Sequence, residues 1–167
     1  HHPSEGSQMA ADIHRRLKFS NADAWYADFL IRNHLRPLFL YTAQKNGKMT
    51  QRALTRFFIK TRPHTPDLLI LAAADMAGKK LLQEAGFLEF ASDLLKIYYN
   101  RHLPAASEPP LLDGHDIIRH LSLKPSPVFA QILDQVEESR LCGEISTRQQ
   151  AIELARKIME FKNDGLT

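Results

Sequence analysis

The chain has 167 residues, of which 44% are hydrophobic and 25% are charged, and its mean hydropathy is −0.32. These values exclude a disordered chain, and no stretch approaches the ~18 apolar residues that span a bilayer. The N-terminus also lacks the basic and then apolar pattern of a signal peptide. The single cysteine, Cys142, excludes an internal disulfide framework and a multi-cysteine zinc site, so we expect a reducing, cytoplasmic compartment.

The charge is unevenly distributed along the chain. Residues 1–80 contain 13 Lys and Arg and 6 Asp and Glu, a net charge of +7, whereas residues 81–167 contain 9 and 13, a net charge of −4. No acidic residue occurs between Asp28 and Asp67, although eight Lys and Arg residues do. This asymmetry indicates a polyanionic partner for the first half, and the alternative is a solvated face whose acidic neighbours come from other segments.

The pattern predicts an all-α protein, because strand-like alternation is absent and turn residues stand where helices would begin. A helix is predicted at residues 4–18, and its apolar stripe consists of Met9, Ile13 and Leu17. Ser20 is predicted to cap a second helix that runs to about residue 33. Trp25 and Phe29 are expected on the buried side of that helix.

Turn residues divide the next part of the chain. The second helix should end before Pro37, and residues 42–48 are predicted to form a polar loop. Thr50 is predicted to cap a helix that closes at Arg62–Pro63. The following helix, at residues 67–77, is almost wholly apolar and should lie in the centre of the core.

A proline-rich segment is predicted to separate two domains. A longer helix, beginning near residue 79 or 84, should end at Arg101, and the prolines follow it. We therefore predict a helical body at 1–102, a linker at 103–112 and a tail domain at 113–167. The tail should contain three short helices, at 114–120, 127–141 and 148–162, with Gly143 as a stop signal and Thr147 with Gln150 as a capping box.

Basic residues with a four-residue spacing are the first candidate site. Lys48, Arg52, Arg56 and Lys60 would stay on one side of a helix and rise by ~6 Å per step, opposite an apolar face. This spacing fits sequence-independent contact with phosphates, and the alternative is again a solvated face. Arg36 belongs to the same acid-free stretch, and Lys124 and Arg148 are weaker candidates because the tail is net acidic.

A second candidate site is a metal centre. Asp75 lies within an apolar helix, where a carboxylate is costly unless it is paired or bound to a cation, and His34 lies at a helix end. A His and a buried Asp on neighbouring helices are a minimal start for a divalent metal site. The alternatives are a hydrogen-bonded carboxylate and a C-terminal helix cap.

Several stretches resemble the C-terminal part of bacterial tRNA nucleotidyltransferases (CCA-adding enzymes) and their poly(A) polymerase relatives. In the first half these are His2–Gly6 with Arg15-Arg-Leu-Lys-Phe-Ser-Asn21, Arg32-Asn-His-Leu-Arg-Pro37 and Ala72–Ala77. In the second half they are Leu111-Leu-Asp-Gly-His-Asp-Ile-Ile118, Leu123-Lys-Pro-Ser-Pro127 and Gly143-Glu-Ile-Ser-Thr-Arg148. Their order and spacing together cover nearly the whole chain.

The resemblance implies a C-terminal RNA-binding fragment of an enzyme that adds nucleotides to RNA 3′ ends. In such an enzyme, a Mg²⁺-dependent head, which we expect to precede residue 1, would bind CTP or ATP, so this fragment would be inactive alone. The resemblance also implies the later part of an HD-type domain, in which His2, His34 and Asp75 match family metal positions and the His-Asp doublet is missing. The body and tail would hold tRNA by its phosphates and 2′-hydroxyls.

Two other functions stay open at this point. One is a metal-dependent HD-type phosphohydrolase that uses His34 and Asp75. The other is a helical protein-interaction module, in which the basic face meets an acidic protein surface.

Overall fold

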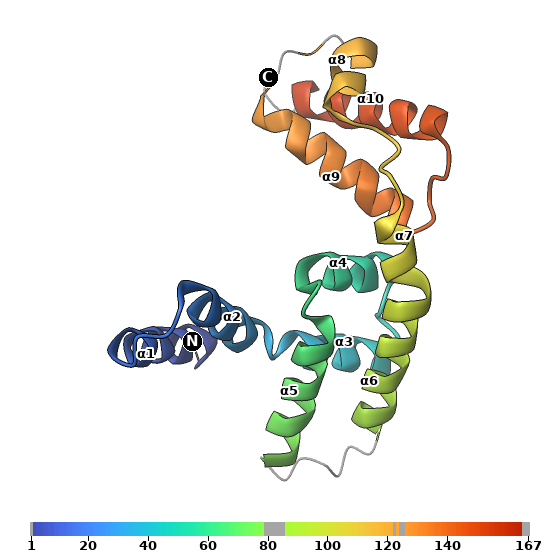
Figure 1. Cartoon of the computed structure of the whole chain (residues 1–167). Coiled ribbons are helices and arrows are strands. Elements are labelled where there is room, and N and C mark those ends of the chain that lie inside the picture. The colour runs from blue at the N-terminus through green and yellow to red at the C-terminus, as the bar shows by residue number, and fades with distance from the viewer. Residues whose placement is uncertain (1, 79–85, 122, 124–125, 165–167) are drawn as a thin grey trace. The chain divides into compact units, whose positions relative to one another are not determined.

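The computed structural model describes residues 2–78, 86–121, 123 and 126–164, with side chains described from Ser4 to Glu160 outside the gaps. The described residues form helices and contain no β-strand, which confirms the predicted all-α class (Figure 1). No helix among them is both long and apolar enough to cross a membrane. The chain divides into two compact units, His1–Tyr99 and Asn100–Thr167.

The described residues of the first unit form six α-helices, followed by a π-helical turn that begins at Tyr98. They are α1 (His2–Arg16), α2 (Asn21–Asn33), α3 (Arg36–Lys45), α4 (Gln51–Thr61), α5 (Thr65–Gly78), α6 (Gly86–Ile97) and the turn η1 (Tyr98–His102). The predicted caps are confirmed: the hydroxyls of Ser20 and Thr50 accept hydrogen bonds from the backbone N–H groups of Asp23 and Ala53, each at 3.1 Å. The predicted start of the helix that precedes η1 lies outside the described residues.

Helix α5 forms the centre of the first core, as its apolar sequence predicts. Leu68, Leu69 and Ala72 are at most 1% exposed, and α5 packs against α2, α3, α4 and α6. Aromatic side chains from the surrounding helices complete this core, among them Phe58 and Phe87, each 1% exposed. Burial of each such side chain contributes about 1.5–3 kcal/mol to folding.

Helix α3 corrects the prediction of a polar loop at residues 42–48. Helix α2 ends at Asn33, before Pro37 as predicted, but Pro37 then stands in the first turn of a new helix, where its missing N–H costs no helical hydrogen bond. Burial of Pro37, Leu40 and Tyr41 anchors α3 to the core, so the helix continues to Lys45. The loop is thereby reduced to the few residues around Gly47, whose φ of 64° favours glycine.

The two N-terminal helices pack through a different face from the one that hydrophobicity predicts. The stripe of Met9, Ile13 and Leu17 is 47–67% exposed, whereas Gly6, Ser7 and Ala10 carry the less exposed face of α1. A Cβ at Gly6 would lie 3.4 Å from the side chain of Ile31, so small residues allow α1 to approach α2 closely.

Trp25 is also more exposed than expected. Its side chain is 57% exposed, and its ring lies against the ring of Phe29 (centroids 5.5 Å apart) and the ring of His64 on the turn before α5 (5.7 Å). Phe29 is half-buried. The prediction that Trp25 lies in the interior is therefore wrong, because the ring covers the outer side of the contact between α2 and α5.

The second unit is a small helical bundle with its own core. Its helices are α7 (Leu103–Ser107), α8 (Gly114–Leu121), α9 (Pro127–Leu141) and α10 (Arg148–Asp164), and α8, α9 and α10 pack together. Gly143 ends α9 with a φ of 79°, as predicted. Thr147 and Gln150 form the predicted capping box, with bonds of 3.2 and 3.1 Å. Helix α7 lies within the predicted linker at 103–112.

Candidate nucleic-acid interface

Helix α4 presents three basic side chains on the face opposite its buried side. Leu54, Phe57 and Phe58 are at most 6% exposed and fix the inner face of the helix. Arg52, Arg56 and Lys60 are exposed, because they follow one another at four-residue intervals on the other side. Lys48 is exposed as well, but it precedes the cap residue Thr50 and is not on the helix, which corrects the predicted four-residue helical row.

Helix α3 adds a fourth cation and an aromatic ring beside α4. Arg36, at the start of α3, is exposed, and its Nε donates a hydrogen bond to Asn33 Oδ1 at 2.5 Å. Asn33 is itself held by a bond from its Nδ2 to the Phe29 carbonyl oxygen at 2.6 Å. This chain of contacts orients the Arg36 guanidinium. Phe39, one turn further along α3, is 69% exposed because the opposite side of the helix faces the core.

A hollow of about 310 Å³ lies between α3 and α4. Its lining is apolar at the base, where Leu40, Ala43, Ala53 and Phe57 contribute, and Phe39 also lines it. The three cations in the lining are Arg36, Arg56 and Lys60. Neither α3 nor α4 contains an acidic residue, so the hollow is surrounded by positive charge on both of its helices. We call Arg36, Arg52, Arg56 and Lys60, together with this hollow, the basic surface.

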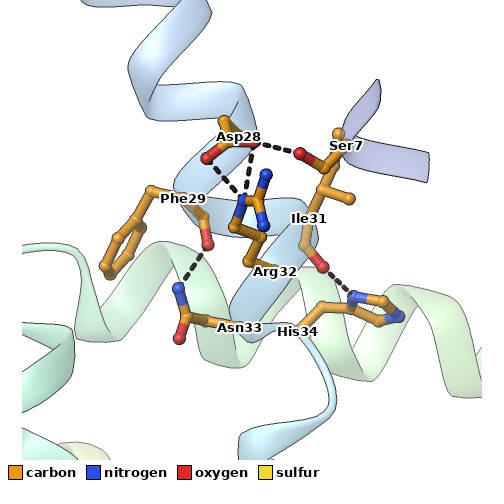
Figure 2. A network of polar contacts seen from close by, with 7 residues as sticks. All are labelled: Ser7, Asp28, Phe29, Ile31, Arg32, Asn33 and His34. Carbon is orange, nitrogen blue, oxygen red and sulfur yellow. Dashed lines mark hydrogen bonds and ion pairs between the residues drawn. The ribbon is translucent and has the colours of Figure 1, made fainter. Parts of the chain in front are cut away.

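Figure 2 shows the polar contacts that fix the end of α2 just before the basic surface. Asp28 accepts hydrogen bonds from the Ser7 hydroxyl and from Arg32 Nε, the latter at 2.8 and 2.9 Å. The hydrogen bond from Ser7 holds the pKa of Asp28 below its ordinary value; partial burial opposes it, and Arg32 acts in the same direction. The carboxylate therefore ties α1 to α2, and Arg32 turns toward this network.

The metal candidates do not assemble into a donor set within the described residues. His34 Nδ1 lies 2.6 Å from the Ile31 carbonyl oxygen, as Figure 2 shows, and Asp75 is half-buried on α5. Across the described part of the chain, no group of three or more His, Cys, Asp and Glu side chains is arranged to hold a metal ion. The side chain of His2 lies outside the described residues. The metal site predicted at His34, Asp75 and His2 therefore stays a prediction, and we derive no chemistry through a metal ion.

Two tail residues complete the predicted set. Lys124 lies outside the described residues. Arg148 is the other weaker candidate predicted from the sequence. Its Nη2 donates a hydrogen bond to Asp116 near the start of α8. Its guanidinium therefore serves the packing of α10 on α8.

The hollow itself was not predicted from the sequence. Phe39 follows Arg36 by three residues, a spacing that places both on one face of a helix, but the sequence pattern predicts only a helix end before Pro37 and no new helix that begins there. Once α3 is recognised, two spacings could have located the site: Arg36 and Phe39 are three residues apart on α3, and Arg56 and Lys60 are four residues apart on α4.

Comparison with known proteins finds similarity to tRNA nucleotidyltransferases. The chain is 29% identical over 152 residues to an A-adding tRNA nucleotidyltransferase of Deinococcus radiodurans, covering 90% of this chain and 33% of that protein. It is 29% identical over 109 residues to a CC-adding tRNA nucleotidyltransferase of Synechocystis, covering 65% of this chain and 24% of that protein. This chain is related to the tRNA nucleotidyltransferases.

A shorter stretch of the chain is similar to another tRNA nucleotidyltransferase. An A-adding tRNA nucleotidyltransferase of Halalkalibacterium halodurans is 42% identical over 53 residues, which is 32% of this chain and 12% of that protein. The chain thus spans about a third or less of the curated tRNA nucleotidyltransferases that it matches. No protein-family model matches the chain. No solved structure matches it either.

Proposed function

We propose that this chain is the RNA-binding, C-terminal part of an enzyme of the tRNA nucleotidyltransferase type, and that its basic surface holds tRNA by the phosphates. The observation that carries the proposal is the basic surface itself: four exposed cations on two helices that contain no carboxylate. The relationship to A-adding and CC-adding tRNA nucleotidyltransferases supports tRNA as the polyanion.

The spacing of the cations suits a phosphodiester backbone. Arg52, Arg56 and Lys60 are four residues apart, so each step rises by ~6 Å along α4. Each phosphate that they neutralise releases counterions, and this release drives binding without reading sequence. Recognition of a folded RNA would then depend on its shape and its 2′-hydroxyls.

The chemistry of nucleotide addition is assigned to the part of the enzyme that this chain does not span. There the RNA 3′-hydroxyl would attack the α-phosphate of CTP or ATP, and pyrophosphate would leave, with Mg²⁺ supplying charge stabilisation. The residues of this chain contribute by binding and orienting the RNA. We propose that the chain is inactive alone and that it works in the cytoplasm, where a single unpaired cysteine is stable.

Reversal of charge on α4 tests the proposal. Fluorescence anisotropy with labelled tRNA should give micromolar or tighter binding, and the combined variant Arg52→Glu, Arg56→Glu, Lys60→Glu should lose about 100-fold or more in affinity, because three cationic contacts become repulsive. The slope of log affinity against log salt should fall by roughly 2–3 for the variant.

The matched control reverses three exposed cations of the second unit. The variant Arg119→Glu, Arg156→Glu, Lys157→Glu changes the net charge by the same amount, and all three side chains are exposed. It should bind tRNA within about threefold of the unaltered chain. Equal losses in the two variants would reduce the effect to net charge alone and contradict the assignment to α4. Displacement of tRNA by an acidic protein, with no salt-dependent tRNA binding of its own, would favour an interaction module instead.

A further inference from the structure

The hollow between α3 and α4 has more structure than contact with phosphates requires. A row of exposed cations binds a polyanion without a cavity. Here, however, an exposed aromatic ring and other apolar side chains line a hollow among the cations. Phe39 is 69% exposed and lines the hollow together with Arg36, Arg56 and Lys60, so its ring is open to a ligand that the cations also reach. This combination suits a ligand that is flat and apolar on one part and anionic on another.

We propose that the hollow binds one unstacked nucleotide of an RNA strand, with its base against Phe39 and its phosphates on Arg36, Arg56 and Lys60. The inference rests on the proposed RNA-binding function and adds a site for a single base to it. A nucleobase has a π-face that stacks on an aromatic ring whatever its sequence, and the attached phosphates supply the negative charge.

The size and charge of the hollow favour a nucleotide over other amphiphilic anions. Its volume of about 310 Å³ is at the lower end for ligand pockets, so it suits a ring system better than a long acyl chain. The cations line the same hollow from both helices: Arg36 on α3, and Arg56 and Lys60 one turn apart on α4. Phosphates on both sides of one nucleotide would meet them.

The positions of the cations are set before any ligand arrives. The Arg36 side chain is oriented by Asn33, and the buried face of α4 fixes the side of the helix from which Arg56 and Lys60 project. An arginine guanidinium presents a planar fork that matches two phosphate oxygens. Because a base in duplex RNA is already stacked on both faces, the occupant must come from a loop, a bulge or a single-stranded end.

The test separates the base from the backbone. Anisotropy is measured with a labelled eight-nucleotide oligoadenylate and with an abasic ribose-phosphate oligomer of the same length. Phe39→Ala should weaken oligoadenylate binding about tenfold, because stacking is lost, and should leave abasic binding and the salt slope unchanged. The control, Ile70→Ala, removes an equally exposed apolar side chain (66%) from α5 and should change neither affinity.

A second measurement gives a positive signal for stacking. In the variant Trp25→Phe, Phe39→Trp, the new indole is the only tryptophan, and oligoadenylate should quench its fluorescence while the abasic oligomer does not. Circular dichroism melting of each variant confirms that it is folded.

The outcomes distinguish this inference from the proposed function. Unchanged oligoadenylate affinity in Phe39→Ala, together with loss of binding in the α4 charge-reversal variant, would overturn the base site and leave RNA binding in place. Equal losses on the abasic oligomer would also overturn it, since Phe39 would then act without a base. Retention of both affinities in the charge-reversal variant would contradict the proposed function itself.

Discussion

Asp116, near the start of α8, takes part in three polar contacts that join it to Asp113 and to α10. Its Oδ2 accepts a hydrogen bond from the Asp113 backbone N–H at 3.2 Å, and Asp113 Oδ1 accepts one from the Asp116 N–H at 2.9 Å. Arg148 donates a third bond to Asp116 from α10. Burial alone would raise the pKa of Asp116, but the Asp113 N–H and Arg148 outweigh it and hold the pKa below its ordinary value.

This shift predicts an acid-sensitive contribution to stability. Because the pKa is lower in the folded chain, the ionised form stabilises the fold above about pH 4, and that contribution is lost as the pH falls through the folded pKa. Asp116→Asn should lower the free energy of unfolding by about 1–2 kcal/mol at pH 7, the usual size of a lost cap and ion pair. Urea unfolding at pH 7 and at pH 2 measures the difference.

The control for Asp116 is an exposed carboxylate of the same unit. Asp134→Asn on α9 should change the free energy of unfolding by less than about 0.5 kcal/mol at either pH. The free energy of unfolding of Asp116→Asn is compared with that of the unaltered chain at both pH values. If the difference is as large at pH 2 as at pH 7, ionisation of Asp116 is not its cause.

Residue-scale contacts were predictable where one short stretch contains both partners. Ser20, Thr50 and the pair Thr147 and Gln150 were each placed correctly, because a cap joins residues three apart in the sequence. The Asp113 and Asp116 pair has the same spacing and was missed, since Asp at the fourth position is a less usual capping-box residue than Glu or Gln. The bond from Arg148 spans 32 residues and left no local signal.

At the scale of elements, one arginine joins α7 to α9. The Arg140 side chain is 8% exposed; it donates to Glu137 Oε1 and Oε2 at 2.7 and 2.8 Å and to the Ala105 carbonyl oxygen at 2.9 Å. These bonds hold α7, within the segment predicted as a linker, against the bundle. The linker was predicted from the prolines, which mark breaks in a helix but do not show whether the segment is packed.

Removing this arginine should loosen the second unit. Arg140→Met keeps the apolar stem but loses the charged hydrogen bonds, so the free energy of unfolding should fall by about 1–3 kcal/mol. Arg140→Lys should recover only part of the lost free energy of unfolding, because an ammonium cannot reproduce the planar fork. Urea unfolding quantifies both variants. Arg119→Met, an exposed cation on α8, is the matched control, and a loss of equal size there would contradict the special role of Arg140.

The same scale explains how much of the candidate site could be foreseen. The positions of Arg52, Arg56 and Lys60 follow from their spacing and from the apolar residues between them, and their exposure agrees. The hollow depends on α3, whose existence rests on tertiary burial of Leu40 and Tyr41 more than on local signals. Packing between helices thus determines that a helix forms at Arg36–Lys45, which the hydrophobic periodicity of the sequence alone does not predict.

For the whole molecule, the two compact units differ in net charge, and each has its own core. Residues 1–99 contain 14 Lys and Arg and 9 Asp and Glu, a net charge of +5, whereas residues 100–167 contain 8 and 10, a net charge of −2. Each unit has its own buried cluster, one around Leu68 and Phe58 and the other around Ile117 and Ile132. The difference in charge is visible in the sequence, but the exposed faces of α1 and α2 are not, because the contact between these two helices depends on small residues of α1.

Separate cores predict that RNA binding and tail stability can be uncoupled. Ile132 and Leu68 are both 0% exposed, and replacing either with Ala should cost its own unit about 2–5 kcal/mol, since a cavity is left in a packed core. Ile132→Ala should lower the melting temperature of the second unit and leave tRNA affinity within about threefold. Leu68→Ala should lower the melting of the first unit and abolish tRNA binding once that unit unfolds.

Calorimetry combined with anisotropy across a range of temperatures separates these cases. In Ile132→Ala, tRNA binding should persist above the temperature at which the tail melts, because the basic surface belongs entirely to α3 and α4 of the first unit. In Leu68→Ala, loss of binding should coincide with the first unit's own transition. A loss of tRNA affinity in Ile132→Ala that follows the melting of the tail would place essential RNA contacts there and would contradict a basic surface that is sufficient by itself.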